Sequence, residues 1–291
     1  MKFLIVDAFT ETIFGGNPAG VVLIPDGEDY PDETTMVKTA AELRYSETAF
    51  IKKLGEKEFQ TRYFTPAAEV DLCGHATIGT FCALAYLGII KDGDTVMNHT
   101  LAGDLEINVS DGFVMMEMAT PEDLGTLGDQ AAIEELYEIM GTKYDPEKIP
   151  LVPKMISTGL PDIMMPLATQ KDLNDMEPDM KALTELSKKY NVVGVHAFTL
   201  DAEDGVVAHA RNFAPLYDID EEAATGTSTG AMTYYLYLNG VIGSDAQCKF
   251  IQGEKMARPS AIRSEIHANE KRCDIKVGGS AVVLAEGEIN I

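Results

Sequence analysis

The sequence predicts an α+β protein built from two related halves, in each of which a curled antiparallel sheet surrounds a central apolar helix. Three observations support this fold class. A stretch of about 30 residues occurs twice, strand patterns outnumber helical patterns, and each half contains one helix that is apolar on every side. Such a helix must be buried on every side, so strands have to wrap around it.

The repeat consists of Thr61–Ile90 and Ala210–Ile242, which share the plan strand, acidic loop, glycine, apolar helix and glycine stop. Setting Gly74 against Gly226 aligns the helices without a gap. The matching pairs are Arg62/Arg211, Phe64/Phe213, Pro66/Pro215, Thr77/Thr229, Leu84/Leu236, Gly88/Gly240 and Ile90/Ile242. A common register over 17 residues indicates duplication, and a period far longer than a solenoid repeat implies two related domains.

The polar stretch Glu122–Gln130 contains two glycines and is the predicted domain boundary. We therefore expect one half to consist of residues 1–120 plus 278–291, and the other of residues 121–277. A chain of 291 residues is long enough for two such domains.

Composition excludes several classes of partner. The net charge of −24 repels nucleic acid and anionic membranes. The longest membrane-like run, Ala76–Ile90, has only 15 residues, and a membrane span needs about 20. The N-terminus lacks a signal-peptide pattern. The four cysteines have no CxxC pairing, as expected of reduced thiols in a cytoplasmic protein; they are Cys73, Cys82, Cys248 and Cys273.

In the first half, apolar runs and alternating patterns predict a series of strands and one surface helix. The helix starts at Asp32 as N-cap and continues to about Leu43, with Val37, Ala40 and Ala41 on its buried face. The predicted strands are Lys2–Phe9, Ala19–Ile24, a strand entered at Arg44–Ile51, Glu58–Thr65 and three strands within Gly93–Ala119.

In the second half, Asp129 is predicted to cap a helix whose apolar residues recur at helical spacing, and Pro178–Lys189 forms a second surface helix. The apolar residues of the first helix are Ile133, Leu136, Tyr137 and Met140. The remaining predicted strands are two within Leu151–Leu167, two within Val192–Phe213, further strands punctuated by Gln252-Gly253 and Arg258-Pro259-Ser260, and Val282–Ala285.

The starts of the two apolar helices are candidate anion sites. Each begins with a glycine and small or polar residues, at Gly74-His75 and Gly226-Thr227. Unpaired backbone N–H groups and the helix dipole favour an anion there. Two such sites facing each other would hold a small carboxylate from both sides.

Glu47 and Cys73 are the candidate proton-transfer groups. Glu47 lies among Tyr45, Ala49 and Phe50, where partial burial suits a general acid or base, although a solvated glutamate at a strand end is the plainer interpretation. Cys73 precedes a helix N-terminus, which favours a reactive thiolate. No second Cys/His pair has ligand spacing, so we expect no metal site.

A glycine-rich turn, Phe14–Gly20, lies between the first two strands. It contains neither GxGxxG nor GK[ST], so a nucleotide loop is not predicted. Two interpretations remain open. The turn is a tight connection, or the Asn17 amide faces a ligand.

These motifs together resemble the PhzF-like family, named after the phenazine-biosynthesis isomerase. The residues that carry the resemblance are Phe14-Gly-Gly-Asn-Pro-Ala, Ser46-Glu47-Thr48, Phe64-Thr-Pro, Asp71-Leu-Cys-Gly-His-Ala-Thr, Phe213-Ala-Pro, Ala224-Thr-Gly-Thr, Gln252-Gly and Arg258-Pro-Ser. The resemblance implies the diaminopimelate epimerase fold: two pseudo-symmetric halves, each a β-barrel around a helix, with the site between them.

The resemblance also implies residue roles. Glu47 corresponds to the glutamate that moves a proton without metal or organic cofactor, and Gly74-His75 to the pair at the first helix. The acidic residue and the Gly-Ser pair of the second helix correspond to Glu222, Gly226 and Thr227. Glu222 stands where the family has Asp, which changes the expected size and shape of the substrate. Thr225 replaces the second thiol of two-cysteine epimerases, so a two-thiol racemase is disfavoured.

We therefore expect a cytoplasmic, cofactor-independent homodimeric isomerase or epimerase acting on a small amino or hydroxy acid that carries a carboxylate. In this hypothesis Glu47, His75 and Glu222 are catalytic, and Asn17, Gly74, Gly226 and Thr227 bind substrate. The alternatives are a dehydratase or epimerase that uses Cys73 as its base, and a non-catalytic protein that binds a small molecule or a partner.

Overall fold

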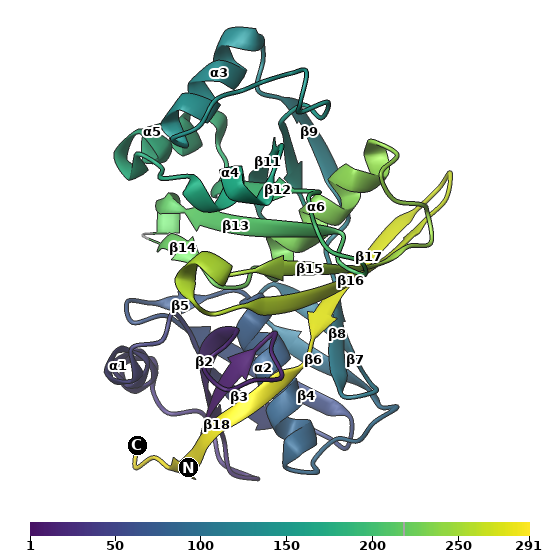
Figure 1. Cartoon of the computed structure of the whole chain (residues 1–291). Coiled ribbons are helices and arrows are strands. Elements are labelled where there is room, and N and C mark those ends of the chain that lie inside the picture. Colours follow the sequence, from purple (N-terminus) through teal and green to yellow (C-terminus); the bar gives the residue numbers. More distant parts are fainter. Residues whose placement is uncertain (218) are drawn as a thin grey trace. The chain divides into compact units, whose positions relative to one another are not determined.

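A computed structural model describes residues 1–217 and 219–291 (Figure 1). The chain forms two compact units. Unit 1 consists of Met1–Glu117 and Gly278–Ile291, and unit 2 of Met118–Val277. Both units combine sheet and helix, and strands outnumber helices in each.

Unit 1 pairs its strands in the order β18–β1–β2–β3–β4–β6–β7–β8, with the short β5 also beside β4. The strands are β1 (Lys2–Ala8), β2 (Asn17–Leu23), β3 (Thr48–Lys53), β4 (Glu58–Phe64), β5 (Glu69–Val70), β6 (Thr95–Thr100), β7 (Gly103–Ser110), β8 (Phe113–Glu117) and β18 (Ala281–Glu288). The helices are α1 (Glu33–Leu43) and α2 (Gly74–Tyr86).

Unit 2 pairs its strands in the order β9–β10–β11–β12–β13–β15–β16, with β14 also beside β13. The strands are β9 (Glu122–Thr126), β10 (Lys154–Ser157), β11 (Pro161–Leu167), β12 (Gly194–Thr199), β13 (Ala208–Ala214), β14 (Ile219–Glu222), β15 (Gln247–Gln252), β16 (Ser260–Ala268) and β17 (Cys273–Gly279), which crosses into unit 1 at its end. The helices are α3 (Gln130–Ile139), α4 (Gln170–Asp175), α5 (Met180–Tyr190), α6 (Gly226–Leu238) and the short 3₁₀ helices η1 (Pro215–Tyr217) and η2 (Glu254–Met256).

The two apolar helices are buried, as the sequence predicts. Helix α2 contacts β1, β2, β3, β8 and β18, and helix α6 contacts β10, β11 and β16. Both are 13 residues long, and most of their residues are buried, although Tyr86 and Leu238 at their C-terminal ends are exposed. Packing strands around such a helix removes apolar surface from water on every side, which is the main favourable term in folding.

An antiparallel sheet was expected in each half, but the sheets contain both antiparallel and parallel pairs. Each unit contains two parallel pairs, β2–β3 and β4–β6 in unit 1, and β11–β12 and β13–β15 in unit 2. A helix lies between the members of each pair in the chain, and parallel strands need such a crossover. The sequence pattern gave the strands but not their directions.

The repeated Arg-x-Phe motif has the same packing in both units. Arg62 makes two hydrogen bonds of 2.7 and 2.6 Å with Glu69, and Arg211 makes two of 2.9 and 2.8 Å with Glu221. Each guanidinium also lies about 5 Å from the ring of the phenylalanine two residues on. Paired carboxylate and ring contacts suit the planar guanidinium, so this part of the repeat stabilises the fold.

Both predicted N-caps are confirmed. The predicted buried face of α1 contains one error. Asp32 accepts a hydrogen bond from Thr35 N, and Asp129 accepts one from Ala132 N. In α1, however, the buried residues are Met36, Thr39 and Ala40, and the predicted Ala41 is exposed. A rotation of the helix by about one residue accounts for the difference.

Several short elements were not predicted, and β9 and α4 are among them. The polar stretch Glu122–Gln130 contains β9, which pairs with β10. Backbone pairing does not require apolar side chains, so the pattern hid this strand. The compact units divide between Glu117 and Met118, close to the expected division after residue 120, and again between Val277 and Gly278. Helix α4 has Thr169 as its N-cap, and the Thr169 hydroxyl accepts a hydrogen bond from Asp172 N.

Among the described residues, no helix combines the length and the apolar character needed to cross a bilayer.

Candidate active site

The loop that carries Glu47 connects α1 to β3. Helix α1 ends at Leu43, and the left-handed backbone of its C-cap residue Arg44 (φ 60°) terminates the helix. The N–H of Gly20 on β2 then donates to the Glu47 carbonyl at 3.3 Å, which fixes the loop to the start of the parallel β2–β3 pair. The Glu47 side chain is 13% exposed. Glu47 is therefore partly buried, and the plainer interpretation of a solvated glutamate at a strand end is wrong.

The start of α2 brings two further candidate groups to Glu47. Cys73 is the extended N-cap residue and His75, only 4% exposed, lies in the first turn. His75 Nε2 is 3.3 Å from Glu47 Oε2 and 3.3 Å from Ser46 Oγ, and Cys73 Sγ is 3.4 Å from His75 Nδ1. We call Glu47, Cys73 and His75 the unit 1 cluster.

Burial keeps the His75 side chain of the unit 1 cluster uncharged. It lowers the pKa of His75, and the neighbouring Glu47 offsets this only in part, so the imidazole is neutral near pH 7. Glu47 Oε2 is buried, and no described residue hydrogen-bonds to it, because its approach to His75 lacks hydrogen-bond geometry. A carboxylate oxygen in this state can accept a proton from a bound molecule.

The unit 1 cluster also contains the atoms of a possible metal site. One ligand atom each from Glu47, Cys73 and His75 lies within 4.8 Å of the others. The expectation of no metal site depended on spacing within Cys and His motifs. It could not include Glu47, which precedes Cys73 by 26 residues.

The geometry of the glycine-rich turn before β2 requires a glycine at position 16. Its φ is +62°, and a Cβ at this position would lie 2.1 Å from Ala8 O. Asp7 Oδ2 accepts a hydrogen bond of 2.9 Å from Phe14 N and holds the same turn. These contacts support the tight-connection interpretation. Asn17 is buried at the start of β2, and its role as a ligand group remains a prediction.

The start of α6 in unit 2 holds the other predicted residues. Thr225 is the extended N-cap residue, followed by Gly226 and Thr227. The Thr225 hydroxyl donates to Glu222 Oε2 at 2.8 Å. Glu222 is half-buried, so this contact orients its carboxylate next to the helix start.

Gln252, which the sequence analysis left without a role, holds this loop. Its Nε2 donates to Glu222 O at 2.8 Å and to Thr225 Oγ1 at 3.1 Å, and its Oε1 accepts from Thr225 N at 3.3 Å. Ser260 Oγ donates to Ala223 O at 2.7 Å. The Gln252-Gly and Arg258-Pro-Ser motifs therefore position the start of α6.

Replacing Gly253 by Ala should destabilise unit 2 by about 2 kcal/mol, because the φ of +81° is unfavourable for Ala and a Cβ would lie 2.4 Å from Arg258 O and 2.6 Å from Ala223 O. Gly205→Ala is the matched control. Gly205 has a similar φ of +85° with nothing within 4 Å of the added Cβ, so its cost should be about 1 kcal/mol. Urea unfolding measures both, and equal losses would contradict the proposed backbone clash.

Asp162 is a buried carboxyl group that the sequence analysis did not single out. It is 2% exposed and accepts a hydrogen bond of 2.5 Å from Ser228 in the first turn of α6. Burial raises the pKa of Asp162 to about 6. The only sequence signal was its position after the Gly159-Leu-Pro turn.

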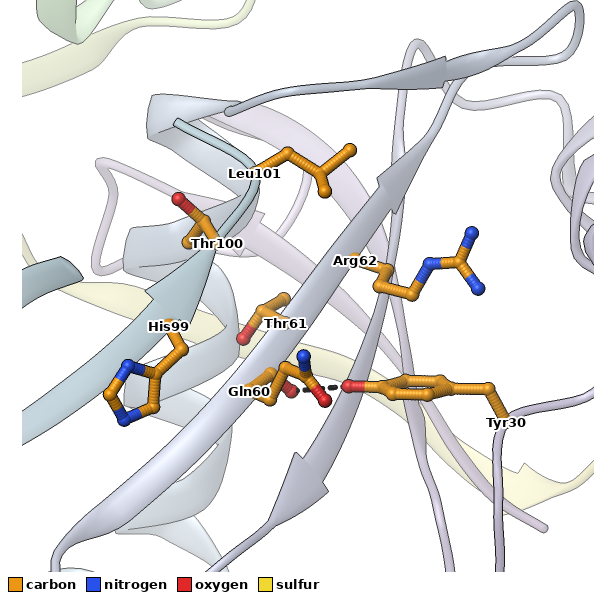
Figure 2. A pocket seen from close by; sticks show the side chains of 7 residues that line it. All are labelled: Tyr30, Gln60, Thr61, Arg62, His99, Thr100 and Leu101. Carbon is orange, nitrogen blue, oxygen red and sulfur yellow. Dashed lines mark hydrogen bonds between the residues drawn. The ribbon is translucent and has the colours of Figure 1, made fainter. Parts of the chain in front are cut away.

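A separate surface cavity of about 310 Å³ lies between β4 and β6 in unit 1 (Figure 2). It is lined by Tyr30, Gln60, Thr61, Arg62, His99, Thr100 and Leu101. Its basic groups are already paired, Arg62 with Glu69, and His99 with Asp104 and Glu58. None of the predicted site residues lines it, so this cavity is not the predicted site.

The structure thus brings together two sets of predicted residues, one in each unit. Glu47, Cys73, Gly74 and His75 gather at the start of α2, and Glu222, Gly226 and Thr227 at the start of α6.

Comparison with known proteins gives consistent findings. The sequence model of the family described as "Phenazine biosynthesis-like protein" matches residues 6–287. An uncharacterized isomerase of Clostridium acetobutylicum is 32% identical, over 98% of this chain and 96% of that protein. The trans-2,3-dihydro-3-hydroxyanthranilate isomerase of Pseudomonas fluorescens is 28% identical, over 99% of both chains. The crystal structure of the Bacillus anthracis phenazine biosynthesis protein of the PhzF family superposes with a TM-score of 0.88 and 26% identity, over 100% of this chain and 99% of that one.

Proposed function

Because the chain belongs to the phenazine biosynthesis-like (PhzC-PhzF) family, we propose that it is a cofactor-independent isomerase or epimerase that moves a proton on a small amino or hydroxy acid. One observation carries the proposal. Glu47 Oε2 is buried without a hydrogen-bond partner among the described residues, 3.3 Å from a neutral imidazole. This arrangement suits a carboxylate that takes a proton from carbon and returns it elsewhere.

In this mechanism Glu47 removes a proton next to an acidifying group of the substrate, and the same carboxyl delivers it to another carbon or to the other face. His75 and Ser46 lie beside the carboxylate and can hydrogen-bond to the substrate or to the transferred charge. Backbone N–H groups at Gly74 would hold the substrate carboxylate at the positive end of α2.

The proposal gives unit 2 a role in binding as well. The start of α6, with Gly226 and Thr227, is a second place for the substrate carboxylate. Glu222 would bind a substrate amine or act as the second proton-transfer group. We propose that the two units are pseudo-symmetric β-barrels around α2 and α6, and that Asn17 is among the groups that bind the substrate.

The relative from Pseudomonas fluorescens suggests the substrate class. Its name specifies a ring that carries an amino, a hydroxy and a carboxylate group. Such compounds fit a site that combines an anion-binding helix start with acidic groups, so trans-2,3-dihydro-3-hydroxyanthranilate is the first compound to test. Glu222, one methylene longer than the family's Asp, favours a substrate of different size.

A second candidate uses Cys73 as the base of a dehydratase or epimerase. Its support is the 3.4 Å distance between Cys73 Sγ and His75 Nδ1, which suits transfer of the thiol proton to the imidazole. The two candidates share one site and differ in the group that touches the substrate carbon.

The test of the proposed function is exchange of solvent deuterium into substrate. The protein is incubated in D₂O with trans-2,3-dihydro-3-hydroxyanthranilate and with a panel of small amino and hydroxy acids, including any compound that co-purifies with it. Mass spectrometry should show incorporation of one deuterium into at least one compound, catalysed by the protein. A compound that binds but never exchanges or changes would favour a non-catalytic binding protein.

Dialysis against EDTA should leave this exchange activity unchanged. In the proposed mechanism the carboxylate, the imidazole and the helix N–H groups supply all the interactions, so no Lewis acid takes part. The measurement compares exchange rates before and after dialysis, with metal content checked by elemental analysis. An activity lost with the metal and restored by adding zinc would overturn the cofactor-independent mechanism.

A further inference from the structure

We propose that Glu47, Cys73 and His75 bind a thiophilic divalent cation such as Zn²⁺, and that the bound cation inhibits the enzyme. The binding site stands on the geometry of the unit 1 cluster alone. Its inhibitory effect rests on the proposed function, in which Glu47 must be free to accept a proton.

The distances in the unit 1 cluster are close to those of a tetrahedral zinc site. Bonds of about 2.0–2.3 Å to nitrogen, oxygen and sulfur place tetrahedral ligand atoms roughly 3.3–3.6 Å apart. Glu47 Oε2 lies 3.3 Å and Cys73 Sγ 3.9 Å from His75 Nε2, and all three ligand groups lie within 4.8 Å of one another. Small side-chain rotations would complete the coordination.

The chemistry of the three groups also fits zinc. A thiolate, an imidazole and a carboxylate are the three ligand types that zinc takes in proteins, and three protein ligands leave the fourth position for water. The mixed donor set discriminates against Mg²⁺ and Ca²⁺, which prefer oxygen ligands alone.

Because the ligand groups of the unit 1 cluster are largely buried from water, a bound cation can supply the interactions that water would otherwise make. His75 is 4% and the Glu47 side chain 13% exposed, and Glu47 Oε2 has no hydrogen-bond partner among the described residues. An unpaired carboxylate oxygen is costly to bury, so coordination to a cation relieves that cost. The chain's net charge of −24 raises the local concentration of cations further.

Coordination would occupy the carboxylate oxygen that the proposed reaction uses. A Glu47 oxygen bound to zinc cannot accept a proton from carbon, and the bound water would occupy space next to α2. Zinc should therefore lower activity reversibly, and EDTA should restore it.

The direct test uses Co²⁺ as a spectroscopic probe on the full-length protein after EDTA dialysis. One equivalent of Co²⁺ should produce a thiolate-to-cobalt charge-transfer band in the near ultraviolet, and Zn²⁺ should displace it. Cys73→Ser should abolish the band, and Glu47→Gln and His75→Gln should each weaken Co²⁺ binding by at least about tenfold. Cys273→Ala is the matched control, since this half-buried cysteine lies outside the cluster, and it should keep the band. Circular dichroism checks that every variant is folded.

The outcomes separate this inference from the proposed function. No charge-transfer band in the wild-type protein, or a band that persists in Cys73→Ser, overturns the metal site even where deuterium exchange is found. A band that depends on Cys73 supports the site even where no substrate exchanges. Where exchange is found, loss of at least tenfold in its rate at saturating Zn²⁺ supports inhibition, and an unchanged rate overturns it.

Discussion

Replacing Glu47 by Gln should lower the rate of deuterium exchange into the substrate by at least about 10²-fold, the low end for loss of a general acid or base. Gln has nearly the same shape, but its amide cannot take up a proton at neutral pH. Glu47 Oε2 has no hydrogen-bond partner in the described part of the chain, so the substitution removes no hydrogen bond at that atom. Initial exchange rates and urea unfolding curves measure the two effects separately.

The Cys73→Ala variant distinguishes Glu47 from Cys73 as the group that transfers the proton. Cys73 approaches His75 from the side of Nδ1, and in the proposed mechanism it transfers no proton to the substrate. The variant should keep most of the exchange activity. Full exchange in Glu47→Gln together with loss in Cys73→Ala would move the chemistry to the thiol and establish the alternative mechanism.

Asp162→Asn should stabilise the protein at pH 8 by up to about 3 kcal/mol. The native carboxyl has a pKa of about 6 against 3.8 for an unperturbed group, and this difference corresponds to about 3 kcal/mol. Asn has nearly the same shape, and its oxygen can accept the hydrogen bond from Ser228 Oγ that Asp162 accepts in the native protein. The gain comes from removing a buried charge that has only partial compensation.

The sign of the pH dependence follows from the raised pKa. The native state binds the Asp162 proton more tightly than the unfolded state does, so this stabilisation is fully present below pH 3.8. It is lost as the pH rises through about 6. The difference in unfolding free energy between Asp162→Asn and wild type should therefore grow between pH 4 and pH 7 and then level off.

Asp204→Asn is the control for the change in net charge, because Asp204 is exposed in the same unit. It should shift stability by less than about 0.5 kcal/mol at every pH. A pH-independent effect of Asp162→Asn would show that the carboxyl group titrates in the native state as it does in the unfolded chain, so that its pKa is not raised.

The local elements of the fold follow from the sequence because they depend on local periodicity and capping. Asp32 and Asp129 act as N-caps where the pattern placed them, and both apolar helices start at their glycines. Strand direction does not follow from the local pattern, because side chains alternate in the same way in parallel and antiparallel strands. Strand β9 was missed because its polar side chains carry no strand pattern.

The candidate active site also combines features that follow from the sequence with features that depend on tertiary packing. The sequence by itself determined which chemical groups are present: Glu47 in a polar turn, Cys73 and His75 at one helix start, and Glu222 before another. It also determined that each helix starts with a glycine that leaves room for an anion.

Only the tertiary structure decided which of these groups meet. The parallel pairing of β2 with β3 and the packing of α2 on both strands bring Glu47 to 3.3 Å from His75, across 28 positions of the sequence. Tertiary packing likewise brings Gln252 into hydrogen-bond contact with Thr225, and Asp162 with Ser228. Periodicity and capping act over a few residues, whereas these contacts are set by the packing of strands and helices distant in the chain.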